Sequence, residues 1–237
     1  MKLLLTSNGL SNPSIENALE ELIGKPREEA RIAFIPTAGF VEASDWRHSR
    51  EWLVNDMYRI SQFCGSIDII SLADLKREEI VPRLEYADVI FIGGGNVFYL
   101  SYWMEKLGLF EELPRLLKTR VYAGISAGSM IATDSIRTAS QAIENPDIFH
   151  DKEFDILGPK GRSAGKTAKL VNFVVRPHYN AKYFPNINGD FLEEIAKDVK
   201  VPLYAIDDQS AIKVINGKVK VITEGSYIVL NKSLLAK

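Results

Sequence analysis

Residues 121–128 read Val-Tyr-Ala-Gly-Ile-Ser-Ala-Gly, and this stretch decides both the expected fold and the expected site. The apolar run over 121–124 predicts a β-strand, and a run compatible with a helix follows it. A serine at such a sharp turn is presented above the sheet edge, and the helix N-terminus behind it offers N–H groups and a positive dipole end. The pattern indicates that Ser126 is a nucleophile; a tight packing turn is the alternative.

Similar apolar runs lie upstream and alternate with longer amphipathic segments. Strands are expected over 3–6, 31–36, 67–71, 87–92 and 121–124, and helices over 12–23, 44–63, 76–84, 97–106 and 110–118. Ser44 is the expected N-cap of the second helix. This alternation predicts βαβ units and a mainly parallel sheet flanked by helices, a three-layer α/β fold. The early strands are nearly all apolar, as expected when helices cover both faces.

The second half of the chain has a different pattern. Residues 135–165 are rich in polar residues, Gly and Pro, which predicts long loops. A strand over 170–175, a helix over 190–197 and a strand over 203–206 follow. Runs over 211–214, 218–222 and 227–230, with Asn216-Gly217 and Glu224-Gly225 as turns, predict a terminal antiparallel meander. No linker or repeat divides the chain, so one domain is expected over residues 1–237.

Composition excludes several classes of protein. Of the 237 residues, 46% are hydrophobic and 25% are charged, which is usual for a globular domain. The net charge of −2 provides no basic field for nucleic acid. The single cysteine, Cys64, cannot form an internal disulfide. No apolar stretch approaches the roughly 20 residues that span a bilayer, and the N-terminal run of leucines is too short for a signal peptide. A cytoplasmic protein that binds no membrane is expected.

A serine nucleophile needs a base, and the chain offers three histidines. His48 lies in a polar stretch of an expected helix, which indicates a solvated surface position. His150 lies in a polar loop. His178 closely follows the strand expected over 170–175, where a parallel sheet places its functional loops. These positions favour His178 as the general base, with a structural histidine at a strand end as the alternative.

The base in turn needs an acid to orient it. Asp207 and Asp208 follow the strand expected over 203–206, on the same sheet edge as Ser126 and His178 if the strands are parallel neighbours. The residues alone do not separate the two. A turn or N-cap before Gln209 is the alternative role for either.

The triple glycine of residues 93–95, followed by Asn96, ends the fourth expected strand. It lacks the Gly-x-Gly-x-x-Gly spacing of a dinucleotide site. Backbone N–H groups of Gly94 or Gly95 are instead expected to complete an oxyanion hole with the N–H of Ala127. No cluster has metal-ligand spacing, so neither a metal nor a cofactor is expected. Nearby aromatic residues are expected to form core or pocket wall, namely Phe98, Tyr99, Trp103, Tyr179 and Phe184.

Six segments occur together in a characteristic order: Ile-Pro-Thr-Ala at 35–38, Ile-Gly-Gly-Gly-Asn-Val-Phe at 92–98, Gly-Ile-Ser-Ala-Gly at 124–128, Ile-Arg-Thr at 136–138, Arg-Pro-His-Tyr at 176–179, and Ala-Ile-Asp-Asp-Gln-Ser-Ala-Ile at 205–212. No single segment is very specific, but the ordered set resembles peptidase family S51, the group of peptidase E and cyanophycinase. The resemblance covers nearly the whole chain.

The resemblance implies a fold like the class I glutamine amidotransferases, with serine in place of their cysteine nucleophile. It implies Ser126 as nucleophile, His178 as base, and Gly94 with Ala127 as oxyanion donors. The family's acid follows either the serine, near Gln141 here, or a late strand, at Asp208. Gln141 is not an acid, so the resemblance favours Asp208 over Asp207. The order Ser, His, Asp also argues against an α/β-hydrolase.

The implied activity is that of a serine exopeptidase that hydrolyses dipeptides or short peptides as a monomer or homodimer. Two alternatives remain: a hydrolase of another amide, such as a cyanophycin-like polymer, and a binding module of the same fold without activity. In peptidase E an arginine beyond the histidine holds the aspartyl carboxylate. Here the last arginine is Arg176, and Lys182 lacks the bidentate fork. The resemblance therefore does not carry over an aspartyl preference.

Overall fold

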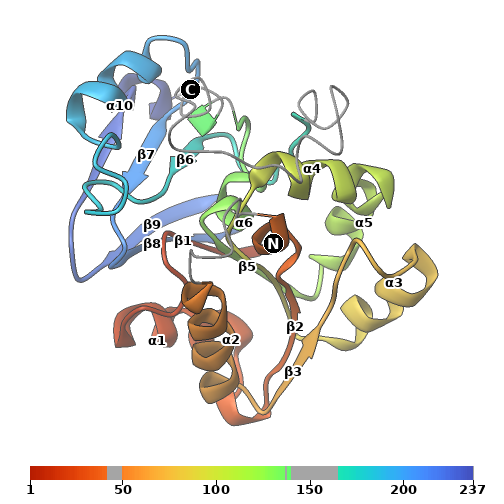
Figure 1. The fold of residues 1–237 in the computed structure, drawn as a ribbon. Helices are drawn as coiled ribbons and strands as arrows, with labels where there is room; N and C mark the ends of the chain where they lie inside the picture. Colours follow the sequence, from red (N-terminus) through yellow and green to blue (C-terminus); the bar gives the residue numbers. More distant parts are fainter. Residues whose placement is uncertain (42–49, 137, 140–164, 237) are drawn as a thin grey trace.

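The computed structural model describes residues 1–41, 50–136, 138–139 and 165–236, which form two sheets surrounded by helices (Figure 1). The larger sheet has the strand order β3-β2-β4-β5-β1-β8-β9. Its parallel part consists of β1 (Lys2–Thr6), β2 (Arg31–Ile35), β3 (Ser66–Ile69), β4 (Val89–Ile92) and β5 (Val121–Ile125). The hairpin of β8 (Ser210–Ile215) and β9 (Lys218–Thr223) extends it through an antiparallel pair between β8 and β1.

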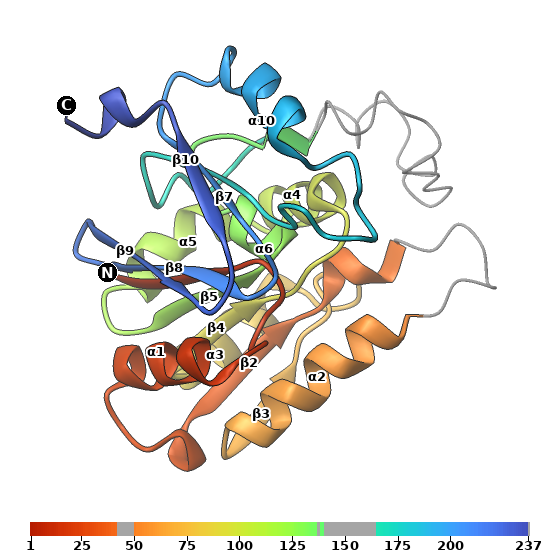
Figure 2. The same cartoon turned by 90° about the vertical axis from the view of Figure 1, so that its left-hand side faces the viewer.

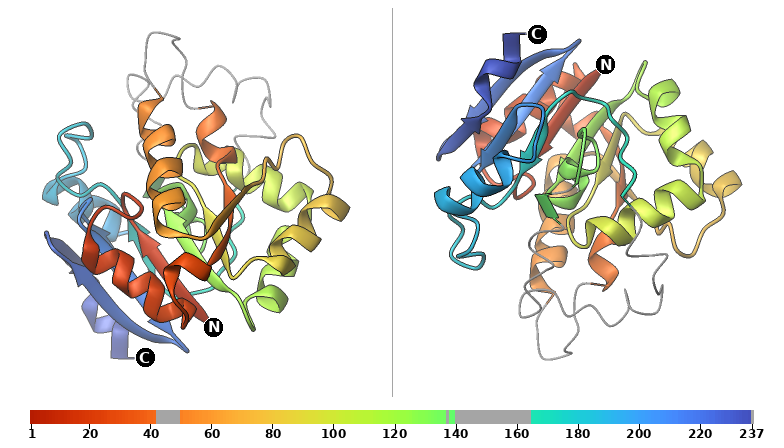
Figure 3. Two further views of the ribbon diagram at one scale, coloured as in Figure 1. Left: turned by 90° about the horizontal axis from the view of Figure 1, so that it is seen from below. Right: turned by 90° about the horizontal axis from the view of Figure 1, so that it is seen from above.

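Alternate residues of β1 enter two different cores, because successive side chains of a strand point to opposite faces. Leu4 packs with α1 (Pro13–Ile23) and α2 (Glu51–Phe63). Leu3 and Leu5 pack on the other face, with α3 (Arg77–Tyr86), α4 (Val97–Lys106) and α5 (Leu109–Leu116). Figure 3 shows these two groups of helices on either side of the sheet. Both faces are covered, which explains the nearly continuous apolar strands.

The smaller sheet has the order β10-β7-β6 and lies beside β8 and β9 of the larger one (Figure 2). β6 (Val174–Arg176) and β7 (Leu203–Ile206) are parallel, and β10 (Tyr227–Leu230) is antiparallel to β7. One face packs on α10 (Gly189–Ala196). The other face places Val175, Tyr204 and Ile206 in the same core as Leu3 and Leu5. The two sheets therefore share a core on this side.

Short elements complete the described chain. Three 3₁₀ helices cover Arg27–Glu29, Thr37–Val41 and Lys232–Ala236, and the single-turn helix α6 (Ala127–Met130) follows β5. No helix among the described residues is long and apolar enough to cross a membrane.

The mainly parallel α/β architecture is as the sequence predicts, whereas the second half departs from it. The meander is wrong in its third strand, because β10 pairs with β7 and not with β9. The carboxylate of Asp207 accepts a hydrogen bond of 2.5 Å from the Ser226 N–H, and this bond directs the chain after β9 to the smaller sheet. The expected strand over 170–175 begins only at Val174, since the Leu170 N–H donates to Ala132 O at 2.9 Å.

A further correction concerns the sheet edge on which the site was expected. Ser126 follows a strand of the larger sheet, whereas His178 and Asp208 follow strands of the smaller one. β6 and β7 are parallel neighbours, as the expectation required, but β5 lies in the other sheet. The helix expected over 44–63 is described from Glu51, and Ser44, His48 and most of residues 135–165 lie outside the described residues. The single domain and the likeness to glutamine amidotransferases stay predictions.

Candidate active site

Ser126 occupies a strained turn between β5 and α6. Its φ of 46° and ψ of −106° are unusual for a residue with a side chain. The turn is held on both sides: the Ser126 N–H donates to Thr6 O at 3.1 Å, and the Ser129 and Met130 N–H groups donate to Ser126 O at 2.9 Å. A Cβ on Gly128 would lie 2.1 Å from Ile92 O, so only glycine allows α6 to approach β4 this closely.

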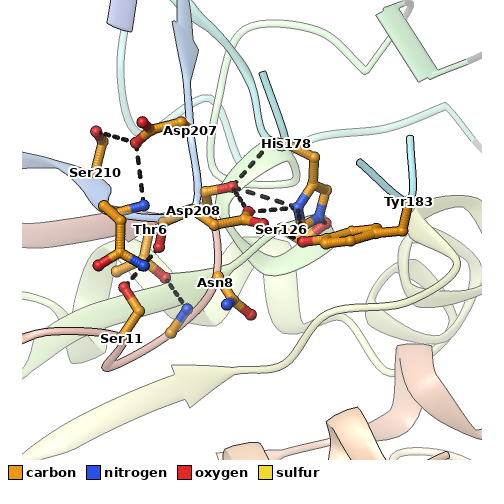
Figure 4. A network of polar contacts seen from close by, with 12 residues as sticks. Thr6, Asn8, Ser11, Ser126, His178, Tyr183, Asp207, Asp208 and Ser210 are labelled. Carbon is orange, nitrogen blue, oxygen red and sulfur yellow. Dashed lines mark hydrogen bonds and ion pairs between the residues drawn. The ribbon is translucent and has the colours of Figure 1, made fainter. Parts of the chain in front are cut away.

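The structure brings Ser126, His178 and Asp208 into one hydrogen-bonded chain, drawn in Figure 4. Ser126 Oγ lies 2.9 Å from His178 Nε2. His178 Nδ1 lies 2.8 Å from Asp208 Oδ1. Both distances are within ordinary hydrogen-bonding range. A carboxylate on Nδ1 favours the tautomer that carries its proton there, which leaves Nε2 free to accept the serine proton.

Asp207 and Asp208 have separate roles, although the sequence could not distinguish them. The Asp207 carboxylate points away from His178 (Figure 4). It accepts from the Gln209 N–H at 3.0 Å, from Ser210 Oγ at 2.6 Å, and from the N–H and Oγ of Ser226. This is the turn-forming role considered as the alternative. Asp208 alone reaches the histidine.

Ser7, which the sequence analysis missed, joins the strands that carry the site. It follows β1, and its Oγ donates to Asp208 Oδ1 at 2.7 Å while accepting from the His178 N–H at 2.9 Å. Its neighbour Thr6 accepts from the Ser126 N–H through its carbonyl. The end of β1 therefore fixes both the serine and the histidine–aspartate pair. No local motif marks Ser7, because its role depends on β1 lying centrally in the larger sheet.

Tyr183 is a second residue that sequence reasoning missed. Its hydroxyl donates to Asp208 Oδ2 and lies 3.1 Å from His178 Nδ1. Its ring meets that of His178 edge-on, with centroids 5.6 Å apart and an interplanar angle of 64°. Tyr183 lies in the irregular segment between β6 and α10, where no periodicity predicts the direction of a side chain. It closes the outer side of the histidine–aspartate pair.

The Asp208 carboxylate is stabilised in its charged form. Burial raises its pKa, but hydrogen bonds from His178, Tyr183 and Ser7 outweigh burial, so the pKa lies below its ordinary value. An ionised Asp208 can accept a hydrogen bond from His178 Nδ1 and stabilise the imidazolium that forms when His178 gains a proton.

The expected oxyanion donors lie beside Ser126. Gly94 is so close that an added Cβ would stand 3.4 Å from Ser126 Cβ. Neither the Gly94 N–H nor the Ala127 N–H takes part in the backbone hydrogen bonds that form the turns, loops and helix caps of the described residues. Gly95, the other candidate, has a φ of 126° and approaches the Ala38 carbonyl, where a Cβ would clash at 2.3 Å. This geometry leaves the Gly94 and Ala127 N–H groups available to a ligand.

Two pockets meet at Ser126 and His178. The first is bounded by the start of α4, α6 and β6, and its lining includes Asn96, Phe98, Met130, Arg176 and Phe184. The second lies towards α2, and its lining includes Asn8, Trp52, Asp56, Gly94 and Tyr183. Of the aromatic residues considered in the sequence, Phe98 and Phe184 form pocket wall, whereas Trp103 and Tyr99 pack in contact with the core. Tyr179 packs beside α10.

Arg176 is the unusual residue of the first pocket. Its side chain is buried, and its Nε has no hydrogen-bond partner. One terminal nitrogen lies 3.9 Å from Met130 Sδ, and the guanidinium carbon lies 5.7 Å from the centroid of the Phe191 ring. No carboxylate pairs with the side chain within the described residues. Burial lowers its pKa to about 10. Lys182, the first cation after His178, is exposed and lines neither pocket. The arginine that precedes the histidine in sequence thus lies in the pocket.

Three residues weighed in the sequence, His48, His150 and Gln141, lie outside the described residues. Within the described part of the chain, no three His, Cys, Asp or Glu side chains are grouped to hold a metal ion.

Fold and site together define an α/β protein whose serine, on a strand-to-helix turn, is hydrogen-bonded to a histidine–aspartate pair. A model of peptidase family S51 matches residues 3–222, and the chain belongs to that family. Membership supports a peptidase, a hydrolase of peptide bonds.

Curated relatives are consistent with this assignment. Peptidase E of Streptomyces coelicolor is 27% identical over 90% of this chain and 81% of its own. An uncharacterised peptidase of Pasteurella multocida is 29% identical over 81% of this chain and 84% of its own. A 1.5 Å crystal structure of a Listeria monocytogenes protein, provisionally assigned to peptidase E, superposes with a TM-score of 0.72 at 20% identity, covering 94% of this chain and 98% of that one. This last likeness shows a shared fold.

Proposed function

We propose that the protein is a serine exopeptidase that hydrolyses dipeptides or short peptides through an acyl-enzyme on Ser126. The observation that carries the proposal is the hydrogen-bonded chain from Ser126 Oγ through His178 to Asp208, with distances of 2.9 and 2.8 Å. Family membership supports peptide bonds as the substrate.

The mechanism follows from this chain of contacts. His178 Nε2 takes the hydroxyl proton as Ser126 Oγ attacks the peptide carbonyl, and Asp208 stabilises the imidazolium. The N–H groups of Gly94 and Ala127 donate to the oxyanion that develops on the carbonyl oxygen. His178 then gives its proton to the departing amine, and water attacks the acyl-enzyme by the same route. The proposal needs no metal or cofactor, and it retains a cytoplasmic monomer or homodimer as its expected form.

Arg176 supports a substrate that carries a carboxylate near the scissile bond. The Arg176 guanidinium is buried and has no anionic partner in the described part of the chain, which is a costly arrangement. A substrate carboxylate in the first pocket would form a charge-assisted pair with it. An acidic side chain, as in an aspartyl dipeptide, and a terminal carboxylate both supply this group. Arg176 thus provides a candidate for the carboxylate-binding role that no arginine after His178 can fill.

A dipeptide library assayed on the wild type, Ser126→Ala and Arg176→Met tests the proposal. We expect Ser126→Ala to lose turnover by about 10⁴-fold or more with its thermal unfolding unchanged, because only a hydroxyl is removed. We expect Arg176→Met to lower kcat/KM on the preferred carboxylate-bearing substrates by about 10- to 100-fold, the effect of one charged hydrogen-bonded contact.

A fluorophosphonate probe provides an independent readout, because it reacts with activated serines whatever the peptide specificity. Labelling of the wild type and not of Ser126→Ala is expected. Turnover retained in Ser126→Ala would exclude Ser126 as the nucleophile. A wild type that neither labels nor cleaves any peptide would instead indicate a binding module of this fold, and cleavage confined to aspartyl–arginine polymers would indicate a cyanophycinase-like activity.

A further inference from the structure

Asp56 is a buried carboxylate that faces the second pocket. It lies on α2, its residue is 5% exposed, and it lines the pocket that Ser126 and His178 also line. Within residues 1–41, 50–136, 138–139 and 165–236, no hydrogen bond or ion pair to its side chain is found. The proposed chemistry at Ser126 does not use Asp56.

The residues around Asp56 would favour a positively charged ligand. Trp52 stands one turn earlier on α2, and Tyr183 and Phe184 contribute rings from the smaller-sheet side. Aromatic faces attract ammonium groups. Among the described residues, the cation that acts on Asp56 is Arg59, one turn later on α2, whose guanidinium is directed to Asn8 O at 3.5 Å. Arg59 acts on Asp56 through space without pairing with it.

Burial makes the charged form of Asp56 costly in the free protein, since no described residue pairs with it. Desolvation raises its pKa to about 7, and the attraction of Arg59 offsets only part of this effect. An apolar residue of similar size would pack at this position without that cost. Packing therefore does not explain why a carboxylate occupies this position, whereas binding of a cationic ligand would.

We propose that Asp56 binds the α-ammonium group of the substrate's N-terminal residue. This inference rests on the proposed exopeptidase function. In a dipeptide the α-nitrogen is separated from the scissile carbonyl carbon by a single carbon, so its receptor must line a pocket that also reaches Ser126, as Asp56 does. An ammonium in the second pocket and a carboxylate at Arg176 in the first would place a short zwitterionic peptide across the serine.

Paired peptides that differ only in N-terminal acetylation test this inference, because acetylation removes the positive charge. We expect the wild type to cleave the free peptide with a kcat/KM about 10- to 100-fold above that of the acetylated one. Asp56→Asn, nearly isosteric, is expected to abolish most of this difference by losing activity on the free peptide. Glu78→Gln, which removes an exposed carboxylate from α3, is the matched control and should retain the preference.

Binding to Ser126→Ala separates this inference from the proposed function, because it requires no turnover. Calorimetric titration with the two peptides should show tighter binding of the free peptide, and the double variant Ser126→Ala/Asp56→Asn should show equal binding of both. Equal affinity of Ser126→Ala for both peptides, or an unchanged preference after Asp56→Asn, would overturn the role of Asp56. Fluorophosphonate labelling of Asp56→Asn at the wild-type rate verifies that its site is intact, and if that variant does not fold, the wild-type comparison of the two peptides still decides.

Discussion

The two sheets contribute to the site in different ways. The larger sheet holds Ser126 rigidly, in a turn bonded to β1 on one side and packed against β4 on the other. The smaller sheet supplies His178 and Asp208 from the ends of two short strands, and side-chain hydrogen bonds fix their loops. The geometry of the candidate active site is thus set by how one sheet packs on the other. Within each sheet, regular backbone pairing only brings the residues to the right edge.

Asp207 and Asp208, which follow β7 of the smaller sheet, provide the test of this comparison with the largest expected effect. Asp208→Asn should lower kcat by about 10²- to 10⁴-fold with modest loss of stability, because the histidine loses the carboxylate that fixes its tautomer. Asp207→Asn should instead lower the free energy of unfolding by about 1–3 kcal/mol, because the hydrogen bonds that hold the turn are weakened. Its kcat should stay within about tenfold of the wild-type value. Steady-state kinetics and urea unfolding on both variants provide the measurement. Equal kinetic effects of the two changes would contradict the separate roles.

The pKa values of two carboxylates, the buried Asp56 and the half-buried Asp208, are shifted in opposite directions. Asp56, beside the larger sheet, has a pKa raised to about 7, and Asp208 has a lowered one. Between about pH 4 and pH 7 folded Asp56 keeps a proton that the unfolded chain releases, so its contribution to stability falls as pH rises through this window and is constant above it. For Asp208 the stabilisation is present at higher pH and is lost as pH falls through its folded pKa.

This difference predicts that Asp56→Asn has a higher free energy of unfolding than the wild type above pH 7, by about 2–4 kcal/mol. The gain in stability should vanish below pH 4. Unfolding free energies of both proteins between pH 4 and 8 measure it, and because Asp208 is present in both, its own titration cancels. A gain that did not depend on pH would mean that Asp56 is not kept neutral by burial.

Tyr183, on the outer side of the histidine–aspartate pair, is the position with the smallest expected effect. Tyr183→Phe keeps the ring against His178 and removes one hydrogen bond to Asp208. We expect kcat/KM to fall by about 2- to 10-fold, since Ser7 and His178 still satisfy the carboxylate. Ser61→Ala, an exposed change on α2, serves as the control. A loss as large as that of Asp208→Asn would show that the hydroxyl does more than orient the acid.

The sequence predicted the larger sheet well and the smaller one poorly, for a physical reason. Strands such as β4 and β5 are short apolar runs between amphipathic helices, and this local pattern determines both their type and their neighbours. The smaller sheet depends on contacts between segments far apart in the chain, such as Asp207 with Ser226. No local pattern contains that information, so the partner of β10 was predicted wrongly.

The same distinction explains which site residues could be found. Ser126 has a local motif, and His178 could be selected because the chain has so few histidines. Asp208 was separated from Asp207 only by the family resemblance. Ser7, Tyr183 and Asp56 act through tertiary packing and carry no sequence signal of their own, so only the structure brings them to the site.

The central position of β1 has a consequence for biosynthesis. Residues 2–6 are translated well before residues 121–125 and 211–215, the two segments with which they pair. Such distant pairing is slow to form and cannot finish until most of the chain has been translated. Because Thr6 and Ser7 hold Ser126 and the His178–Asp208 pair, the candidate active site cannot assemble on a nascent chain until residues 211–215 have been translated.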